Sequence, residues 1–433
     1  MLTKALRAAA PPLLVLATLL GAATAHAAAF ALFEQGAAAI GRGGAFAAGV
    51  DDPSALFYNP AALAGLDGTQ LLLSPSLILF DDSFSGVDPY PGYGVEESTA
   101  QKAFPLPSFY LSRGITRGVT AAVGLTVPFG LQTDWTNSRT FSGRFVAWNS
   151  RIEQIDASAG LAAEVAPRFR LGASLNMTWS KILLERAVAA PLPGTDVAPE
   201  VGKVGLESGR ETALGGTFGA QWVPSDRVSL GGTLRTGTSN EFVTPARFTY
   251  YPFTTGNHAA DSTIAATLPH DQDATVKVRF PLMLLAGLQV KLTPELAAEL
   301  DVNWTRWSAF DTITLALSRN PERSVVAPQA FHNAAAVRLG LEYRLDEYIL
   351  RAGAYYDATP QPEWAMSPLI SDTDRIGLTA GAGFRADSGL SADIYALLVM
   401  FRNRSTEFGN LNHFDGTYKP RAFIFGASLG KKW

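Results

Sequence analysis

The stretch from Phe169 to Trp179 reads Phe-Arg-Leu-Gly-Ala-Ser-Leu-Asn-Met-Thr-Trp, and it alternates apolar residues with polar or small ones. Side chains of a β-strand point to opposite faces in turn, so this period of two predicts a strand with one apolar face. Its length, about ten residues, is what a tilted strand needs to cross a bilayer. Similar alternation at 298–304, 337–345 and 390–398 predicts further strands of this kind.

Alternation alone also fits a soluble sandwich, and three features favour a membrane barrel instead. Aromatic residues cluster at strand ends, where Tyr343 and Tyr348 flank a short turn and Trp179 and Trp304 precede long loops. Such clusters are typical of the interfacial girdles of membrane barrels. The connections alternate between short and long. The chain ends on an aromatic residue, Trp433, as outer-membrane barrels in general do, which predicts a signal for the outer-membrane assembly machinery.

Counting the connections gives the size of the barrel. Six short turns rich in Pro, Gly, Asp and Ser are expected near 114–118, 167–168, 224–226, 293–294, 346–347 and 387–389. Seven long loops are expected near 81–103, 129–150, 185–210, 239–275, 309–330, 358–373 and 404–418. The sequence therefore predicts an all-β fold, a transmembrane antiparallel barrel of about 14 strands over residues 69–433, with short turns and both termini in the periplasm.

The first 27 residues have the three parts of a secretory signal. Lys4 and Arg7 form a basic region, 11–23 is apolar, and Ala25-His26-Ala27 provides the small-x-small cleavage pattern. The alternative, a membrane anchor, would need a longer apolar run. We expect residues 1–27 to be removed, and we expect the mature protein in the outer membrane of a Gram-negative bacterium.

Composition excludes several classes of protein. Without Lys4 and Arg7 the chain has 33 basic and 39 acidic residues, a net charge of −6, which gives no footprint for nucleic acid. There is no cysteine, so no disulfide contributes to stability. Hydrophobic residues make up 47%, yet the longest clear apolar run after the signal, 282–288, is far too short for a spanning helix. The apolar residues must therefore lie in strands.

Residues 28–68 do not alternate and are rich in Ala and Gly. Asp52 can cap a helix that starts at Pro53, and Asn59 can cap a second that starts at Pro60. Because a barrel of about 14 strands has a lumen too wide for its own side chains to fill, we expect this segment to be a helical hatch that plugs the lumen. A loose periplasmic tail is the alternative.

Three stretches resemble the FadL-type outer-membrane transporters of long-chain fatty acids, a family that includes channels for aromatic hydrocarbons such as toluene. The stretches are Ala29-Phe-Ala-Leu-Phe-Glu-Gln-Gly with Ile40-Gly-Arg-Gly-Gly-Ala, the run 51–63 with the hatch motif Asn59-Pro60-Ala61, and Pro128-Phe-Gly-Leu-Gln-Thr-Asp-Trp with Gly143-Arg-Phe. The resemblance implies a 14-stranded barrel with an N-terminal hatch and a gap in its wall for the ligand. It places the mature N-terminus against the ligand, so Phe30 and Phe33 are candidate binding residues. Phe129 and Arg144 of the third stretch are further candidates.

Prolines concentrate in the second and third strands. With a turn near 115–116, Pro107 lies opposite Gly124, and Pro105 and Pro128 lie at nearly the same height. Proline cannot donate to a β-ladder, so these four residues predict a gap in the wall. In lipid, the unpaired backbone must then be satisfied by the hatch, the ligand or water. The alternative is that the prolines end their strands at the outer rim.

The expected outer loop at 239–275 is unusually aromatic at 248–253. Tyr250, Tyr251 and Phe253 are candidates for a first, weak docking site for an apolar ligand, and local packing is the alternative. An arginine that meets a fatty-acid carboxylate could lie among the inward-facing charges of the strands, which for any barrel are expected to be of mixed sign.

Nothing in the sequence indicates catalysis. The four histidines of the mature chain fall in or beside expected loops without metal-ligand spacing, and none lies well inside a strand where a serine could use it. We therefore expect no enzyme, no metal and no cofactor, but a passive, monomeric channel whose partners are the lipid bilayer and a hydrophobic small molecule. Long-chain fatty acids are the favoured ligand; a monoaromatic hydrocarbon channel and a general or structural barrel are the alternatives. A buried arginine or lysine in the pocket would favour fatty acids, and an aromatic, uncharged pocket would favour hydrocarbons.

Overall fold

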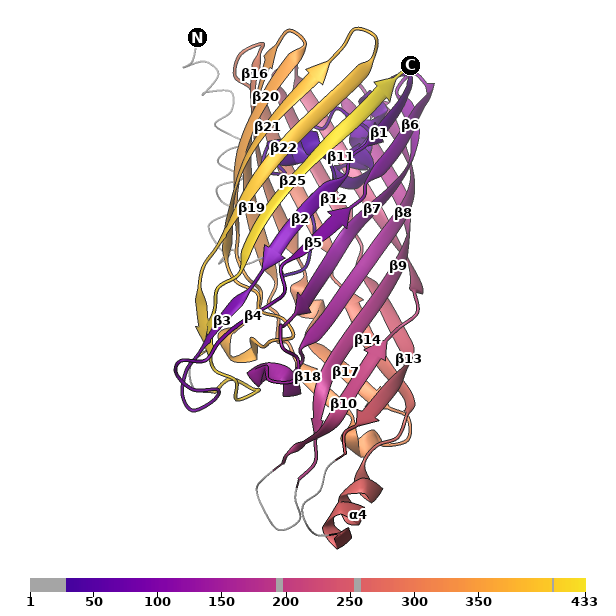
Figure 1. The fold of residues 1–433 in the computed structure, drawn as a ribbon. Helices are drawn as coiled ribbons and strands as arrows, with labels where there is room; N and C mark the ends of the chain where they lie inside the picture. The colour runs from indigo at the N-terminus through magenta and orange to yellow at the C-terminus, as the bar shows by residue number, and fades with distance from the viewer. Residues whose placement is uncertain (1–28, 192–197, 253–257, 407–408) are drawn as a thin grey trace.

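The computed structural model describes residues 29–191, 198–252, 258–406 and 409–433. In this part of the chain the first strand, β1 (Thr69–Leu73), pairs antiparallel with the last, β25 (Arg421–Lys432), so the sheet closes on itself (Figure 1). Several wall strands are interrupted and carry two labels, and together they form a barrel of 14 strands. The predicted barrel is confirmed. The predicted signal segment and Phe253 lie outside the described residues.

The remaining strands of the barrel sheet follow in chain order. They are β2 (Ser76–Asp81), β5 (Lys102–Leu106), β6 (Phe109–Thr116), β7 (Val119–Asp134), β8 (Asn149–Ala166), β9 (Phe169–Ala189), β10 (Glu200–Glu207), β11 (Glu211–Ser225), β12 (Val228–Arg235), β13 (Thr238–Tyr250), β14 (Gln272–Phe280), β15 (Met283–Lys291), β16 (Leu296–Thr305), β17 (Thr312–Leu317), β18 (Val325–Pro328), β19 (Ala334–Leu345), β20 (Tyr348–Asp357), β21 (Arg375–Arg385) and β22 (Leu390–Phe401).

The two faces of the wall differ as the alternation predicts. On β9, Leu175 and Met177 are exposed on the outside, whereas Asn176 and Thr178 are buried in the lumen. An apolar outer surface is what a barrel presents to lipid. None of the helices in the described part of the chain is long and apolar enough to cross a membrane.

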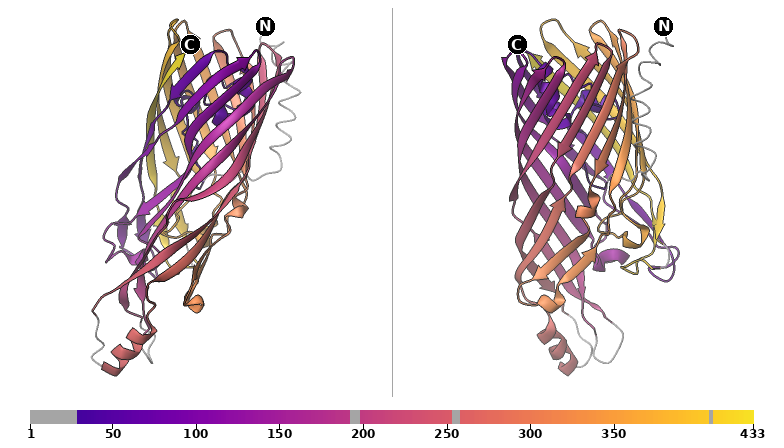
Figure 2. Two further views of the ribbon diagram at one scale, coloured as in Figure 1. Left: turned by 90° about the vertical axis from the view of Figure 1, so that its right-hand side faces the viewer. Right: turned by 180° about the vertical axis from the view of Figure 1, so that it is seen from behind.

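The two ends of the barrel also differ. All six short turns lie at the end that holds both ends of the wall, the short-turn end, which is periplasmic by the rule for bacterial barrels (Figures 1 and 2). At the long-loop end, the loops expected at 185–210 and 239–275 are shorter in the structure than the sequence predicts. The strands there continue, because β10 pairs with both β9 and β13 and so extends the wall. Helix α4 (His258–Thr267) lies at the tip of this extension.

Short elements complete the long-loop end. A separate four-stranded sheet contains β3 (Ser83–Gly86), β4 (Glu96–Ser98), β23 (Arg404–Thr406) and β24 (Gly416–Tyr418). Four 3₁₀ turns lie in the loops, η2 (Ser142–Phe145), η3 (Trp307–Ala309), η4 (Pro321–Arg323) and η5 (Glu363–Ala365).

The segment 29–66 is buried, and its elements pack on the inner faces of wall strands (Figure 1, indigo). It contains α2 (Ala37–Gly41), α3 (Ala55–Tyr58) and η1 (Pro60–Gly65). Helix η1 starts at Pro60 with Asn59 as its cap, as the Asn-Pro pair predicts. Helix α3 starts at Ala55 rather than at Pro53, because Asp52 accepts the N–H of Ser54 and holds the chain in a turn before the helix.

Candidate functional site

A cavity of about 790 Å³ lies between the N-terminal segment and the wall, towards the long-loop end. Much of its lining is apolar and comes from the N-terminal segment, β2, β5, β7 and β25 through Leu32, Ile78, Phe104, Leu131 and Ile424. Four charged groups on the lumen side, Glu34, Lys102, Asp372 and Arg375, also reach it. An apolar chamber with a few polar groups is the usual form of a site for a small hydrophobic molecule.

The wall is open beside this cavity, between β5 and β7. Strand β5 pairs with β2, and its continuation β6 pairs with β7 only up to Phe109↔Leu125. The prolines therefore do not end their strands at the rim: Pro105 lies within β5, and Pro107 lies between β5 and β6. Both lack a backbone N–H, which removes two possible donors from this edge.

The register expected from the sequence was wrong by three residues. Gly124 lies opposite Tyr110 in the paired part of the ladder, not opposite Pro107. The turn falls at Arg117-Gly118 rather than at 115–116, because Gly118 supplies the positive φ of 75° that a tight turn requires.

The N-terminal segment covers the inner edge of β7 at the opening. The N–H of Leu32 donates to the carbonyl of Pro128 (2.9 Å), and the N–H of Gly130 donates to the carbonyl of Phe30 (3.0 Å). The side-chain amide of Gln35 bonds both backbone groups of Val127. The N-terminal segment thus satisfies backbone groups that the missing β5–β7 ladder leaves free.

The cavity continues through the opening to the outer face of the wall. Arg151 and Glu153 contribute to its lining. Along β8 they alternate with Ile152 and Gln154, which are buried towards the lumen, so both charged residues belong to the outer face. Part of the cavity is therefore accessible from outside the barrel.

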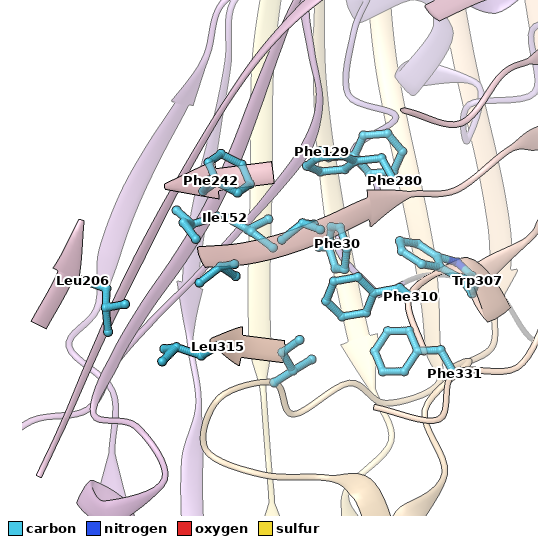
Figure 3. Packing of buried hydrophobic residues seen from close by; sticks show 14 of the residues in the cluster. Phe30, Phe129, Ile152, Leu206, Phe242, Phe280, Trp307, Phe310, Leu315 and Phe331 are labelled. Carbon is cyan, nitrogen blue, oxygen red and sulfur yellow. The ribbon is translucent and has the colours of Figure 1, made fainter. Parts of the chain in front are cut away.

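Phe30 sits in a cage of aromatic side chains next to the cavity (Figure 3). Its ring lies 4.8 Å from Trp307, 5.0 Å from Phe310, 5.9 Å from Phe129 and 6.3 Å from Phe280. It is 2% exposed, so it fills the cage completely. The structure thus brings Phe30 and Phe129 together, but it is Phe30's neighbours Ala29 and Ala31 that line the cavity.

Arg375 at the start of β21 was not singled out from the sequence. Of the two cations on the lumen side of the cavity, Lys102 and Arg375, it has the less exposed side chain. Its Nε and Nη2 both donate to one oxygen of Asp357, at 3.3 and 3.2 Å. Only 18% of its side chain is exposed. Next to it, Asp372 accepts the N–H of Ala29 (3.2 Å) and the hydroxyl of Thr359. Burial raises the pKa of Asp372, and the positive charge of Arg375 opposes this shift.

Other predicted residues lie away from the cavity. Phe33 packs under the guanidinium of Arg338, 4.3 Å away. Arg144 pairs with Glu200 at 2.7 Å in an outer loop. The hydroxyl of Tyr250 donates to the carbonyl of Pro269 (2.6 Å), and Tyr251 lies under the guanidinium of Arg139. These two tyrosines have local partners, and a part in ligand docking stays a prediction.

The motif Asn59-Pro60-Ala61 attaches the N-terminal segment to the wall. Asn59 caps η1 by accepting the N–H of Ala61 (3.1 Å), and it donates to the carbonyl of Ala220 on β11 (3.1 Å). The wall has no side chain at Gly172 of β9, where the turn packs against it. A Cβ there would lie 2.4 Å from the backbone of Pro60. A glycine is therefore required for the turn to approach so closely.

Buried charges hold the preceding part of the segment. The N–H groups of residues 46 and 47 donate to Asp301, and those of 48 and 49 donate to Glu299, at 2.7–3.1 Å. Arg42 lies 3.8 Å from Glu299 and 3.9 Å from Glu342, all three being buried. The wall residues Glu299, Asp301 and Glu342 are inward-facing charges that the alternation predicts. Their partners named here come from the N-terminal segment.

A closed barrel with an apolar outer face, a filled lumen and an apolar cavity defines a membrane channel for hydrophobic molecules. A family model described as outer membrane protein transport protein (OMPP1/FadL/TodX) matches residues 18–432, and the chain belongs to this family. It is therefore an outer-membrane transport protein of a family that carries hydrophobic compounds, and not an enzyme.

Individual relatives agree with this assignment. A protein of Salmonella typhi named long-chain fatty acid transport protein is 23% identical, over 94% of each chain. The crystal structure of a Pseudomonas aeruginosa FadL homologue has a TM-score of 0.83 at 23% identity, covering 94% of this chain and 100% of that one. The toluene transporter TbuX of Ralstonia pickettii has a TM-score of 0.69 at 16% identity, covering 93% and 100%.

Proposed function

We propose that this chain is a passive, monomeric channel for long-chain fatty acids, and that the ligand leaves sideways through the opening between β5 and β7. Residues 28–68 act as the plug that denies a straight aqueous route. Because the cavity reaches the outer face of β8, a ligand in it can move towards lipid without crossing the polar lumen. Transfer from water to an apolar site contributes roughly 0.8 kcal/mol per CH₂ group, so an aliphatic chain favours this route.

The observation that carries the choice of ligand is Arg375, a largely buried arginine in an otherwise mostly apolar cavity. A carboxylate binds a guanidinium through charge-assisted hydrogen bonds. Two N–H groups of Arg375 share one oxygen of Asp357 at 3.2 and 3.3 Å, which is longer than such bonds usually are. The guanidinium has five N–H groups, so the others are left for an incoming anion. An aliphatic acid combines this head group with a chain that suits the apolar lining.

The test compares oleate with the uncharged oleyl alcohol on purified protein in a mild detergent, by native mass spectrometry and calorimetry. Arg375→Met combined with Asp357→Asn removes the cation together with the carboxylate to which it is hydrogen-bonded. We expect this double variant to bind oleate about ten-fold more weakly, since losing a charged hydrogen bond costs on the order of 1.5 kcal/mol or more. Its affinity for oleyl alcohol should not change.

Arg144→Met is the matched control, because Arg144 pairs with Glu200 outside the cavity. Wild-type affinity for oleate in the Arg375 double variant would contradict the carboxylate role of Arg375. Absence of oleate binding by the wild-type protein would reject fatty acids altogether.

A second candidate ligand is a monoaromatic hydrocarbon, and the cage around Phe30 favours it. Aromatic rings pack well edge to face, which is how the cage holds Phe30 itself. A hydrocarbon would have to displace Phe30 to enter. Native mass spectrometry that shows toluene but not oleate retained by the wild-type protein would favour this reading.

A further inference from the structure

The opening between β5 and β7 is bounded at both ends. Towards the short-turn end, pairing resumes at Phe109↔Leu125. Towards the long-loop end, Thr99 forms a bridge with Trp135, and the N–H of Ala100 donates to the carbonyl of Asp134 (2.8 Å). The opening is thus a window in the wall that main-chain pairing bounds at both ends.

One ion pair crosses the window at its outer end. The ammonium of Lys102, the first residue of β5, lies 2.5 Å from a carboxylate oxygen of Asp134, the last residue of β7. About a third of each side chain is exposed, 35% and 29%. Among the described residues, this ion pair joins the first residue of β5 to the last residue of β7 through their side chains.

The two partners face different sides. Lys102 contributes to the lining of the cavity, whereas Asp134 alternates along β7 with Thr133 and Trp135, which are both buried, and so belongs to the outer phase. An anion inside the cavity therefore meets Lys102 before it meets Asp134. The other charges on the lumen side of the cavity are Glu34, Asp372 and Arg375.

We infer that Lys102 and Asp134 form a charge latch across the window, and that an anionic head group opens it by taking the place of Asp134 on Lys102. The inference rests on the proposed function, since it assigns the residue that selects anionic from uncharged amphiphiles at the exit. An incoming carboxylate exchanges one charged partner of the ammonium for another, so Lys102 stays paired while its side-chain link to Asp134 across the window is released. An uncharged molecule of the same length offers no such exchange.

A further cation, Arg151, lines the cavity on the outer face of the wall. Arg151 on β8 lies beside Gln132 of β7 and lines the part of the cavity that reaches the outer face. Its ion-pair partner Glu207 is 4.0 Å away, at the limit of such a pair. A head group that leaves Lys102 therefore meets two charges of opposite sign on the outside of the wall, Arg151 and Glu153.

The experiment measures uptake of radiolabelled oleate and oleyl alcohol by cells that lack a transporter of their own and express each variant. Lys102→Met should reduce oleate uptake about five-fold or more, because it removes the cation that receives the head group. It should not reduce uptake of the alcohol, because it also breaks the ion pair with Asp134. Asp134→Asn should speed release of both molecules, because it opens the latch and keeps the cation. Lys102→Arg should restore oleate uptake.

The matched control is the pair Lys432–Asp67, which joins two exposed side chains at 2.6 Å far from the window. Lys432→Met and Asp67→Asn should change neither uptake. If Lys102→Met transports oleate as the wild type does, or slows oleate and alcohol equally, the latch is wrong. If the wild-type protein neither binds nor transports oleate, the proposed function fails first, and this outcome is distinct from either result with Lys102.

Discussion

Phe30 is the point at which the N-terminal segment is anchored beside the cavity. Its ring is surrounded by four aromatic side chains within 6.3 Å, and its carbonyl accepts the N–H of Gly130 at the inner edge of β7. Replacing the ring would empty the cage and loosen the backbone that covers this edge. Phe30 therefore acts on the cavity through the position of its neighbours.

Phe30→Ala should destabilise the protein by about 3–5 kcal/mol, as truncation of a buried aromatic does. Oleate should bind more weakly, since Ala29 and Ala31 lose their fixed positions on the cavity. The emptied cage should take up toluene, and toluene should raise the thermal midpoint of the variant more than that of the wild type. Thermal unfolding with each ligand is the measurement, and an oleate affinity equal to that of the wild type would contradict it.

Single residues show what the sequence could reveal. The roles of Asn59 and Pro60 at the start of η1 could be predicted from the sequence, because a helix cap is a local feature with a fixed spacing. Arg375 was not, because its place beside the cavity depends on long-range contacts: Asp372, next to it, accepts the N–H of Ala29, which stands 343 positions away in the chain. Residues brought together by closure of a barrel leave no local pattern.

Among the elements, the strands were predictable and their exact pairing was not. A wall between lipid and lumen forces the period of two, so β9 could be recognised from its alternation of apolar and polar residues. The register of β6 and β7 was wrong because Gly114 and Gly118 both permit a turn, and only the structure shows that Gly118 makes it. Pro105 and Pro107 lie where β5 is not paired with β7, and they lack the donor that a ladder requires. That this part of the wall is a gap for the ligand stays a prediction.

The N-terminal segment is the element whose removal is most informative. Deleting Phe30 to Ala64 leaves Asp301 and Glu299 without their four N–H donors, and these carboxylates would then recruit water into the lumen. We expect the deletion variant to conduct ions in planar bilayers, in contrast to near-zero conductance of the full chain. Equally low conductance of both would show that the segment is not the plug.

For the whole molecule, the central question is whether ligand leaves through the wall or along the axis. The segment 29–66 is largely buried against the inner faces of wall strands, and buried charges hold it there. Exposing a chain of about sixteen carbons to a wet lumen would cost more than 10 kcal/mol at roughly 0.8 kcal/mol per CH₂. The proposed wall route would avoid this cost, because a ligand in the window would reach lipid without crossing the lumen.

Closing the window tests that route. Replacing Pro105, Pro107 and Pro128 with Val or Thr supplies the missing N–H groups, so β5 can pair with β7 and uptake of oleate should cease while the barrel still folds. Pro245→Val is the control, because Pro245 lies in β13 opposite Asp273, away from the window. Hydrogen exchange would establish whether the new pairing has formed. If the closed variant shows continuous pairing and cells that carry it still grow on oleate as sole carbon source, the ligand does not leave between these strands.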